Sequence, residues 1–213
     1  MASRDDILRS IRAQNIAAAE LPALDGPWIA YADRAAQFAA ALEAVGGRCV
    51  RVKKVEQLRQ ELEQLPEYAA ARKVVSQVSG AGRCDVDLDA VNGPHALEEI
   101  EFALLPGEFG VCENAAVWVT ERNVRHRALY FLVQHLGLAI PAAALVDNMH
   151  QAYKRLSFTE AGFGAFISGP SKTADIEQSL VIGAHGPRSL SVFLVEEWDD
   201  ARLRRTTSPP TTD

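Results

Sequence analysis

The sequence predicts a single-domain α/β protein with an open, mostly parallel sheet, a mixed edge and helices on both faces. Stretches with helical periodicity alternate with short apolar runs, and glycines and prolines separate them. The 213 residues, 48% of them hydrophobic, suit one hydrophobic core. We expect the domain to span residues 1–198, including an N-terminal helix at about 3–18. Residues 199–213 are polar and proline-containing, which predicts a disordered tail.

The first half of the chain alternates helices with strands. Ser3 and Asp6 form a capping-box-like start for the N-terminal helix. A second helix begins near Asp33 and stops at Gly46, where glycine permits a left-handed cap. The βαβ alternation that follows predicts parallel strands with right-handed connections. The expected elements here are a strand at 49–52, a helix at 55–65, a strand at 73–78 and a surface loop at 79–93.

The middle of the chain is rich in short strand candidates, for which antiparallel pairing is plausible. A helix follows Pro141, which suits a first helical position. The last βαβ unit has a strand ending at Ile167, a helix capped by Thr173 that ends near Gly183, and a final strand. The strand candidates are 102–105, 115–120, part of 128–133, and 190–195.

The polar turn before Thr173 is the most informative segment for function. A helix start presents free N–H groups and a positive dipole end, which favour a bound carboxylate or phosphate. Lys172 adds a flexible positive charge. Lys172 follows Ser171 rather than a glycine, which excludes the phosphate loop of NTPases. The alternative is that these residues only cap a helix. The candidate ligand-binding residues are Ser168, Gly169, Pro170, Ser171, Lys172, Thr173, Asp175 and Gly186.

Two residues are candidates for catalysis. His185 lies in the turn AHGP, and imidazole suits proton transfer near neutral pH; the alternative is a turn histidine that bonds backbone carbonyls. Glu113 precedes an apolar strand, where a carboxylate could act as a base. The histidines show no metal-ligand spacing, so we expect no metal site.

Composition restricts the class of function. The net charge of −6 disfavours a protein that binds along nucleic acid. Cys49, Cys84 and Cys112 are far apart, which argues against a disulfide framework, a zinc site or a cysteine-ligated cluster. We expect no cofactor within this chain. There is no apolar run of membrane-spanning length and the N-terminus is charged, so we expect a cytoplasmic protein.

Several blocks of the sequence resemble the LUD-domain family, the lactate-utilisation proteins. They are SRDDILRSIR, GEFGVCENAAVWVT, QHLGLAIPAAALVDNMHQAYKRL, and SGPSKTADIE followed eight residues later by HGP. The resemblance covers most of the chain. Relatives carry a pair such as Thr-Gly after the glutamate, where this chain has Asn114 and Ala115.

The resemblance implies a fold like that of the sugar-phosphate isomerases and CoA transferases, with Ser168–Thr173 beyond the carboxyl ends of the strands. By analogy with CoA transferases, Glu113 could be a nucleophile. The resemblance further implies a cluster-free subunit of a cytoplasmic system that oxidises L-lactate to pyruvate with iron–sulfur partner subunits. The alternatives are a stand-alone enzyme on a small phosphorylated or CoA-linked substrate, or a non-catalytic assembly subunit.

Overall fold

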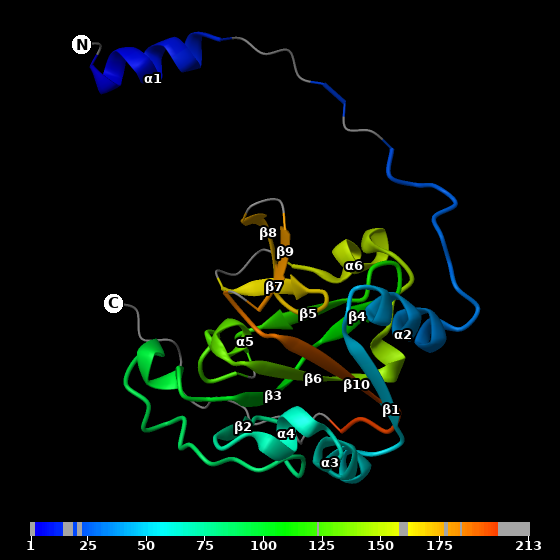
Figure 1. Ribbon diagram of the computed structural model, residues 1–213. Coiled ribbons are helices and arrows are strands. Elements are labelled where there is room, and N and C mark those ends of the chain that lie inside the picture. The colour runs from blue at the N-terminus through cyan, green and yellow to red at the C-terminus, as the bar shows by residue number, and fades with distance from the viewer. Residues whose placement is uncertain are drawn as a thin grey trace.

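A five-stranded, wholly parallel sheet forms the centre of the protein, shown in Figure 1 as a computed structural model. The structure describes residues 3–14, 19–20, 23–122, 124–157, 162–176, 179–183 and 185–199. The strand order is β1-β10-β6-β3-β2. The strands are β1 (Arg48–Val52), β2 (Val74–Ser76), β3 (Phe102–Pro106), β6 (His135–Pro141) and β10 (Ser189–Val195). The open parallel sheet predicted from the sequence is confirmed.

The sheet is covered on both faces, which explains why its strands are nearly continuous apolar runs. Leu190, Val192 and Leu194 of β10 face one core, and Phe193 and Val195 face the other. Helix α2 (Arg34–Ala44) and helix α5 (Leu129–Leu132) pack on the first side. Helices α3 (Val55–Glu63) and α4 (Pro66–Ala70) pack on the second. Helices on both faces were therefore predicted correctly.

Antiparallel pairing occurs in separate sheets rather than at an edge of the parallel sheet. Strands β4 (Phe109–Val111), β5 (Ala116–Thr120) and β7 (Gly164–Ile167) form a three-stranded sheet. Val117 and Val119 of β5 join the core on the α2 side of the parallel sheet. Strands β8 (Lys172–Ile176) and β9 (Ser179–Ile182) form a hairpin beside it (Figure 1). The small sheet therefore acts as a third layer.

Helix α1 (Arg4–Ala13) lies away from the α/β body (Figure 1). Its predicted capping box is present, because the Ser3 side chain accepts from the Asp6 backbone N–H while the Asp6 carboxylate accepts from Ser3. None of its residues is buried. The helix prediction extended to residue 18, and residues 15–18 lie outside the described part of the chain, as do residues 200–213 of the predicted tail.

Three elements differ from the sequence-based expectation. Residues 172–182 form the β8–β9 hairpin rather than a helix capped by Thr173. This segment is rich in β-branched residues, and pairing within the hairpin replaces the helical pattern. Pro141 is the last residue of β6, and the following helix starts at an Asn148 cap. Part of 128–133 is helix α5 rather than a strand, anchored by the Tyr130 hydroxyl donating to Pro106 O at 3.1 Å.

The remaining elements are short. Helix α6 (Met149–Arg155) follows the loop after β6, and single 3₁₀ turns are η1 (Pro94–Leu97) and η2 (Ala142–Ala144). Helix α2 ends as predicted at Gly46, whose φ is +86°. No helix in the described ranges has the length and apolar character needed to cross a membrane.

Candidate functional site

The β8–β9 hairpin brings the two halves of the sequence motif together. Lys172 at the start of β8 pairs with Ile182 at the end of β9. The Ser171 carbonyl accepts from Gly183 N–H at 2.9 Å, and Ser171 N–H donates to Pro187 O at 2.8 Å. A Cβ built on Gly186 would lie 3.0 Å from Ser171 Oγ. Residues 185–187 therefore pack against the turn at Ser171, a contact that the sequence left undecided.

The polar side chains at the base of this hairpin differ in whether they are exposed and free to bind a ligand. The side chains of Lys172 and His185 are exposed. Ser168 is exposed too, but its hydroxyl donates to Asn114 O at 2.6 Å. Thr173 and Asp175 lie within β8, so Thr173 is not a helix cap. Because Lys172–Ile176 is a strand, no helix dipole points at this turn, and Lys172 is the predicted site residue that supplies positive charge.

The turn packs against the end of α2, near the amino ends of the parallel strands. Gly169 has φ +73°, and a Cβ there would lie 2.8 Å from Val45 O. Pro170 is buried next to Gly46, just before β1 begins. Pro187 likewise immediately precedes β10. The expectation that Ser168–Thr173 lies beyond the carboxyl ends of the strands is therefore wrong, because β7 and the hairpin return the chain to the opposite edge.

Glu113 lies in the turn between β4 and β5, close to Ser168 through Asn114. Its Oε2 accepts from Met149 N–H at 2.9 Å at the start of α6. This contact explains an acidic residue here without catalysis, since it satisfies a free N–H at the helix start. Ala115, two residues on, has φ +55°, a left-handed conformation that favours glycine.

An ion pair that the sequence analysis missed lies beside this turn. The Asp147 carboxylate has a side-chain exposure of 3%, and its Oδ1 accepts from Arg34 Nε at 2.9 Å. It also accepts from Tyr31 N–H and from the Gln151 amide. The Arg34 hydrogen bonds in particular lower the pKa of Asp147 to about 2. The polar pair Asp147-Asn148 in front of an apolar helical stripe is a capping signal that could have located it.

The three cysteines occupy different environments. Cys112 is buried and donates to Arg34 O at 3.2 Å, while Cys84 is exposed. Burial raises the pKa of both Cys49 and Cys112 to about 11, so these thiols stay protonated at neutral pH. Over the described ranges, no three His, Cys, Asp or Glu side chains are grouped to hold a metal ion.

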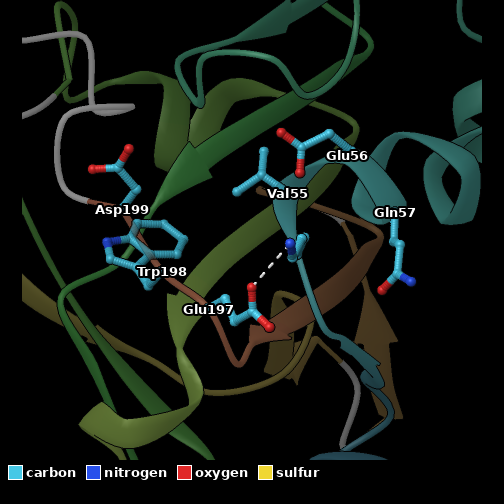
Figure 2. A pocket seen from close by; sticks show the side chains of 7 residues that line it. Val55, Glu56, Gln57, Glu197, Trp198 and Asp199 are labelled. Atoms are coloured by element: carbon cyan, nitrogen blue, oxygen red, sulfur yellow. Dashed lines mark ion pairs between the residues drawn. The ribbon is translucent and has the colours of Figure 1, made fainter.

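A surface hollow of about 550 Å³ lies where β1 and β10 end (Figure 2). Its lining is formed by Lys54–Gln57 at the start of α3 and by Glu197–Asp199 after β10. Lys54 Nζ pairs with Glu197 Oε2 at 3.2 Å. Glu56, Glu197 and Asp199 outnumber the single lysine, so the hollow is unsuited to an anion. None of the site residues predicted from the sequence lines it.

Comparisons with known proteins match this region of the chain. The LUD domain matches residues 94–195, which include every predicted site residue from Glu113 to Gly186. A protein of Halalkalibacterium halodurans called Lactate utilization protein C is 29% identical over 168 residues, covering 70% of this chain and 73% of that protein. The proteins of the same name from Exiguobacterium sp. and Bacillus pumilus are 38% and 31% identical, over 40% and 47% of this chain.

The lengths covered differ between these relatives. The chain spans 40% of the Exiguobacterium protein and 44% of the Bacillus pumilus protein. Among solved structures, a DUF162 family protein from Deinococcus radiodurans matches with a TM-score of 0.59 and 16% identity. That match covers 78% of this chain and 99% of the other, and at this identity it supports the α/β fold alone.

Proposed function

Because the LUD domain matches residues 94–195 and the chain is similar to lactate utilization protein C, we propose that it is a LUD-domain protein that takes part in lactate utilisation. In this proposal the chain is a cluster-free subunit of a cytoplasmic system that oxidises L-lactate to pyruvate. The system contains further subunits, and those subunits carry the iron–sulfur clusters. Support comes from the positions of the three cysteines, since Cys49 lies in β1, Cys84 follows β2 and Cys112 follows β4, far apart along the chain.

Within this function, the base of the β8–β9 hairpin binds a small carboxylate. The observation that carries this proposal is the contact between Gly186 and Ser171, which places the exposed His185 turn beside the exposed Lys172. Lys172 supplies the charge, and a charge-assisted hydrogen bond to a carboxylate is stronger than a neutral one. In this proposal His185 donates a second hydrogen bond to the carboxylate or exchanges a proton. Glu113 is assigned to holding α6 rather than to chemistry.

Calorimetric titration with L-lactate and with pyruvate tests the binding site. Lys172→Ala should weaken binding by about 1.5–3 kcal/mol, the scale of a hydrogen bond to a charged group. Lys154→Ala provides a matched control, since Lys154 is an exposed lysine of α6, and it should bind as the parent does. The melting temperature of both variants should stay close to that of the parent. Unchanged binding by Lys172→Ala would favour a non-catalytic assembly subunit.

A further inference from the structure

Exposed apolar side chains are concentrated on the N-terminal arm, which we define as α1 together with residues 23–29. Among the described residues, nine large hydrophobic side chains are exposed, and five belong to the arm. These five are Ile7, Ile11, Leu24, Trp28 and Ile29. Scattered surface hydrophobics are ordinary, but a concentration on one projecting segment marks an interaction surface.

Helix α1 needs a covering surface in order to remain helical. It has ten residues, and isolated helices shorter than about 12–15 residues are marginal in water. Its capping box supports the first turn, yet Ile7 and Ile11 are 53% and 60% exposed. These two residues are four positions apart, so they lie on one face of the helix. The α/β body of the same chain does not supply the cover (Figure 1).

Among the described residues near the arm, residues 28–31 at its base contact the body. The Trp28 ring stacks on His150 with centroids 3.6 Å apart. Asn148 donates to Ile29 O at 2.8 Å, and Tyr31 N–H donates to the buried carboxylate of Asp147 at 3.1 Å. These contacts hold residues 28–31 against the start of α6, and α1 projects beyond them.

A complementary apolar surface lies on the body. The α5 surface, as we call it, consists of Phe131, Leu132 and Ile182, which are 43%, 42% and 52% exposed. Phe131 is supported by Phe163, whose ring centre is 6.0 Å away. The surface is continuous with the base of the hairpin. A Cβ built on Gly186 would lie 3.5 Å from Phe131 O, and Gly183 packs against Arg188. These three residues make up most of the exposed large hydrophobics outside the arm.

The charges at the edge of the α5 surface fit the first turn of α1. Arg127 and Arg188 are exposed beside the apolar side chains, and because Arg127 already pairs with Glu121 at 3.4 Å, Arg188 is the better partner for a carboxylate of α1. Asp5 and Asp6 form the acidic first turn of α1, next to Ile7. The Asp6 carboxylate already forms an ion pair with Arg9, at 3.4 Å, so Asp5 is the better partner for an arginine of the α5 surface. Pairing of opposite charges at the edge would set the direction in which the helix lies.

We propose that the arm of one copy of this chain covers the α5 surface of a second copy, and that the second copy returns the same contact. Such an exchange is self-complementary and closes as a symmetric dimer. Two short helices and two small patches bury on the order of 1,000 Å², at the low end for a specific interface, which implies a weak dimer with a dissociation constant in the micromolar range. This inference does not depend on the proposed role in lactate utilisation.

Sedimentation velocity of the full chain between about 1 and 200 μM tests the exchange. The parent should change from monomer to dimer over this range. Ile11→Asp places a charge in the apolar contact and should weaken dimerisation at least about tenfold. Arg9→Gln changes the net charge of α1 by the same amount as Ile11→Asp, but at a position away from the Ile7–Ile11 face. Its dimer dissociation constant should stay within about threefold of that of the parent.

Substitutions on the α5 surface test whether α1 contacts that surface or some other part of the second copy. Leu132→Asp should weaken dimerisation at least about tenfold, and Arg188→Glu keeps the test valid should Leu132→Asp fail to fold. A parent that is monomeric at every concentration would overturn the proposal. So would a dimer that is lost in Ile11→Asp but intact in both body variants, since the two arms would then pair with each other or with another face.

Discussion

Asp147 shows how one buried carboxylate can connect distant parts of the chain. It accepts hydrogen bonds from Tyr31, Arg34 and Gln151, which belong to the arm base, α2 and α6. Tyr31 and Arg34 are more than 100 residues away from Asp147 in the sequence, whereas Gln151 is four residues away, so two distant parts of the chain meet at one side chain. The carboxylate is buried because its hydrogen bonds to the Arg34 guanidinium and to backbone offset the cost of removing it from water.

Asp147→Asn should destabilise the protein by about 1–3 kcal/mol at pH 7, because the guanidinium loses its charged partner. The pKa of Asp147 is lowered to about 2 in the folded state, so its stabilising effect is complete above the unfolded value near 3.9 and is lost as the pH falls toward 2. Urea unfolding at pH 7 and near pH 2.5 should show the gap between parent and variant closing. Asp33→Asn, in an exposed cap of α2, should cost almost nothing at pH 7.

Among the residues that the structure describes, Ala115 is the non-glycine residue whose φ is positive. Relatives are expected to carry glycine at this position. We predict that Ala115→Gly is tolerated, since relief of the left-handed strain and loss of a buried methyl group nearly cancel, to within about 1 kcal/mol. Ala115→Val should cost more than about 3 kcal/mol, because a β-branched side chain strongly disfavours φ +55°.

Ala116→Val controls for the added volume, since Ala116 is also buried but lies in strand β5 with ordinary backbone geometry. It should cost about 1–3 kcal/mol, the usual effect of overpacking. Thermal melts of the three variants check the comparison. Equal losses for the two valine variants would show that backbone strain at Ala115 is unimportant.

At the scale of elements, the β8–β9 hairpin depends on how the turn before it packs. Gly169 allows the backbone to approach Val45 O, while Ser171 links the hairpin to Gly183 and Pro187. The Gly169–Val45 contact joins segments that are more than 120 residues apart, whereas the Ser171 hydrogen bonds close the base of the hairpin itself. The hairpin base is therefore positioned by α2 and β10 rather than by its own local preferences.

Gly169→Ala should destabilise the protein by about 2–3 kcal/mol, because the new Cβ meets a backbone oxygen at 2.8 Å in addition to the strain of positive φ. Gly46→Ala serves as the control. Its φ is also positive, at +86°, but its nearest neighbour is a Pro170 side-chain atom at an ordinary 3.7 Å. It should cost only about 1 kcal/mol. Chemical denaturation of both variants measures the difference, and equal losses would show that the close approach is easily relieved.

At the scale of the whole molecule, the α/β body and the projecting arm contribute differently to stability. The body contains the apolar cores on both faces of the sheet, whereas α1 contains no buried residue. Stability should therefore reside in the body, and the arm should matter for association. The contacts between the arm and the body are made by Trp28, which stacks on His150 of α6, and by Tyr31, which donates to Asp147. Helix α1 lies beyond these contacts.

Removal of residues 1–20 should leave the melting temperature of the protein unchanged within about 2 °C at 1 μM, where the proposed dimer is dissociated. Differential scanning fluorimetry of the two chains provides the comparison. A drop of more than about 5 °C would mean that α1 packs on its own body in solution.

The sequence by itself determined the elements whose pattern is local. The capping box at Ser3, the α2 helix ending at Gly46 and the apolar parallel strands were all predicted, because caps, glycine conformations and continuous apolar runs depend on neighbouring residues. The sequence singled out the turn near Ser171 as the start of a helix, and that part of the prediction was wrong because a strand follows the turn. Tertiary structure decided that 172–182 is a hairpin, that its base lies at the amino edge of the sheet, and that Asp147 meets Arg34. The position of the hairpin base and the Asp147–Arg34 pair depend on contacts between distant segments, and within the hairpin the β8–β9 pairing outweighs the helical preference of a short stretch.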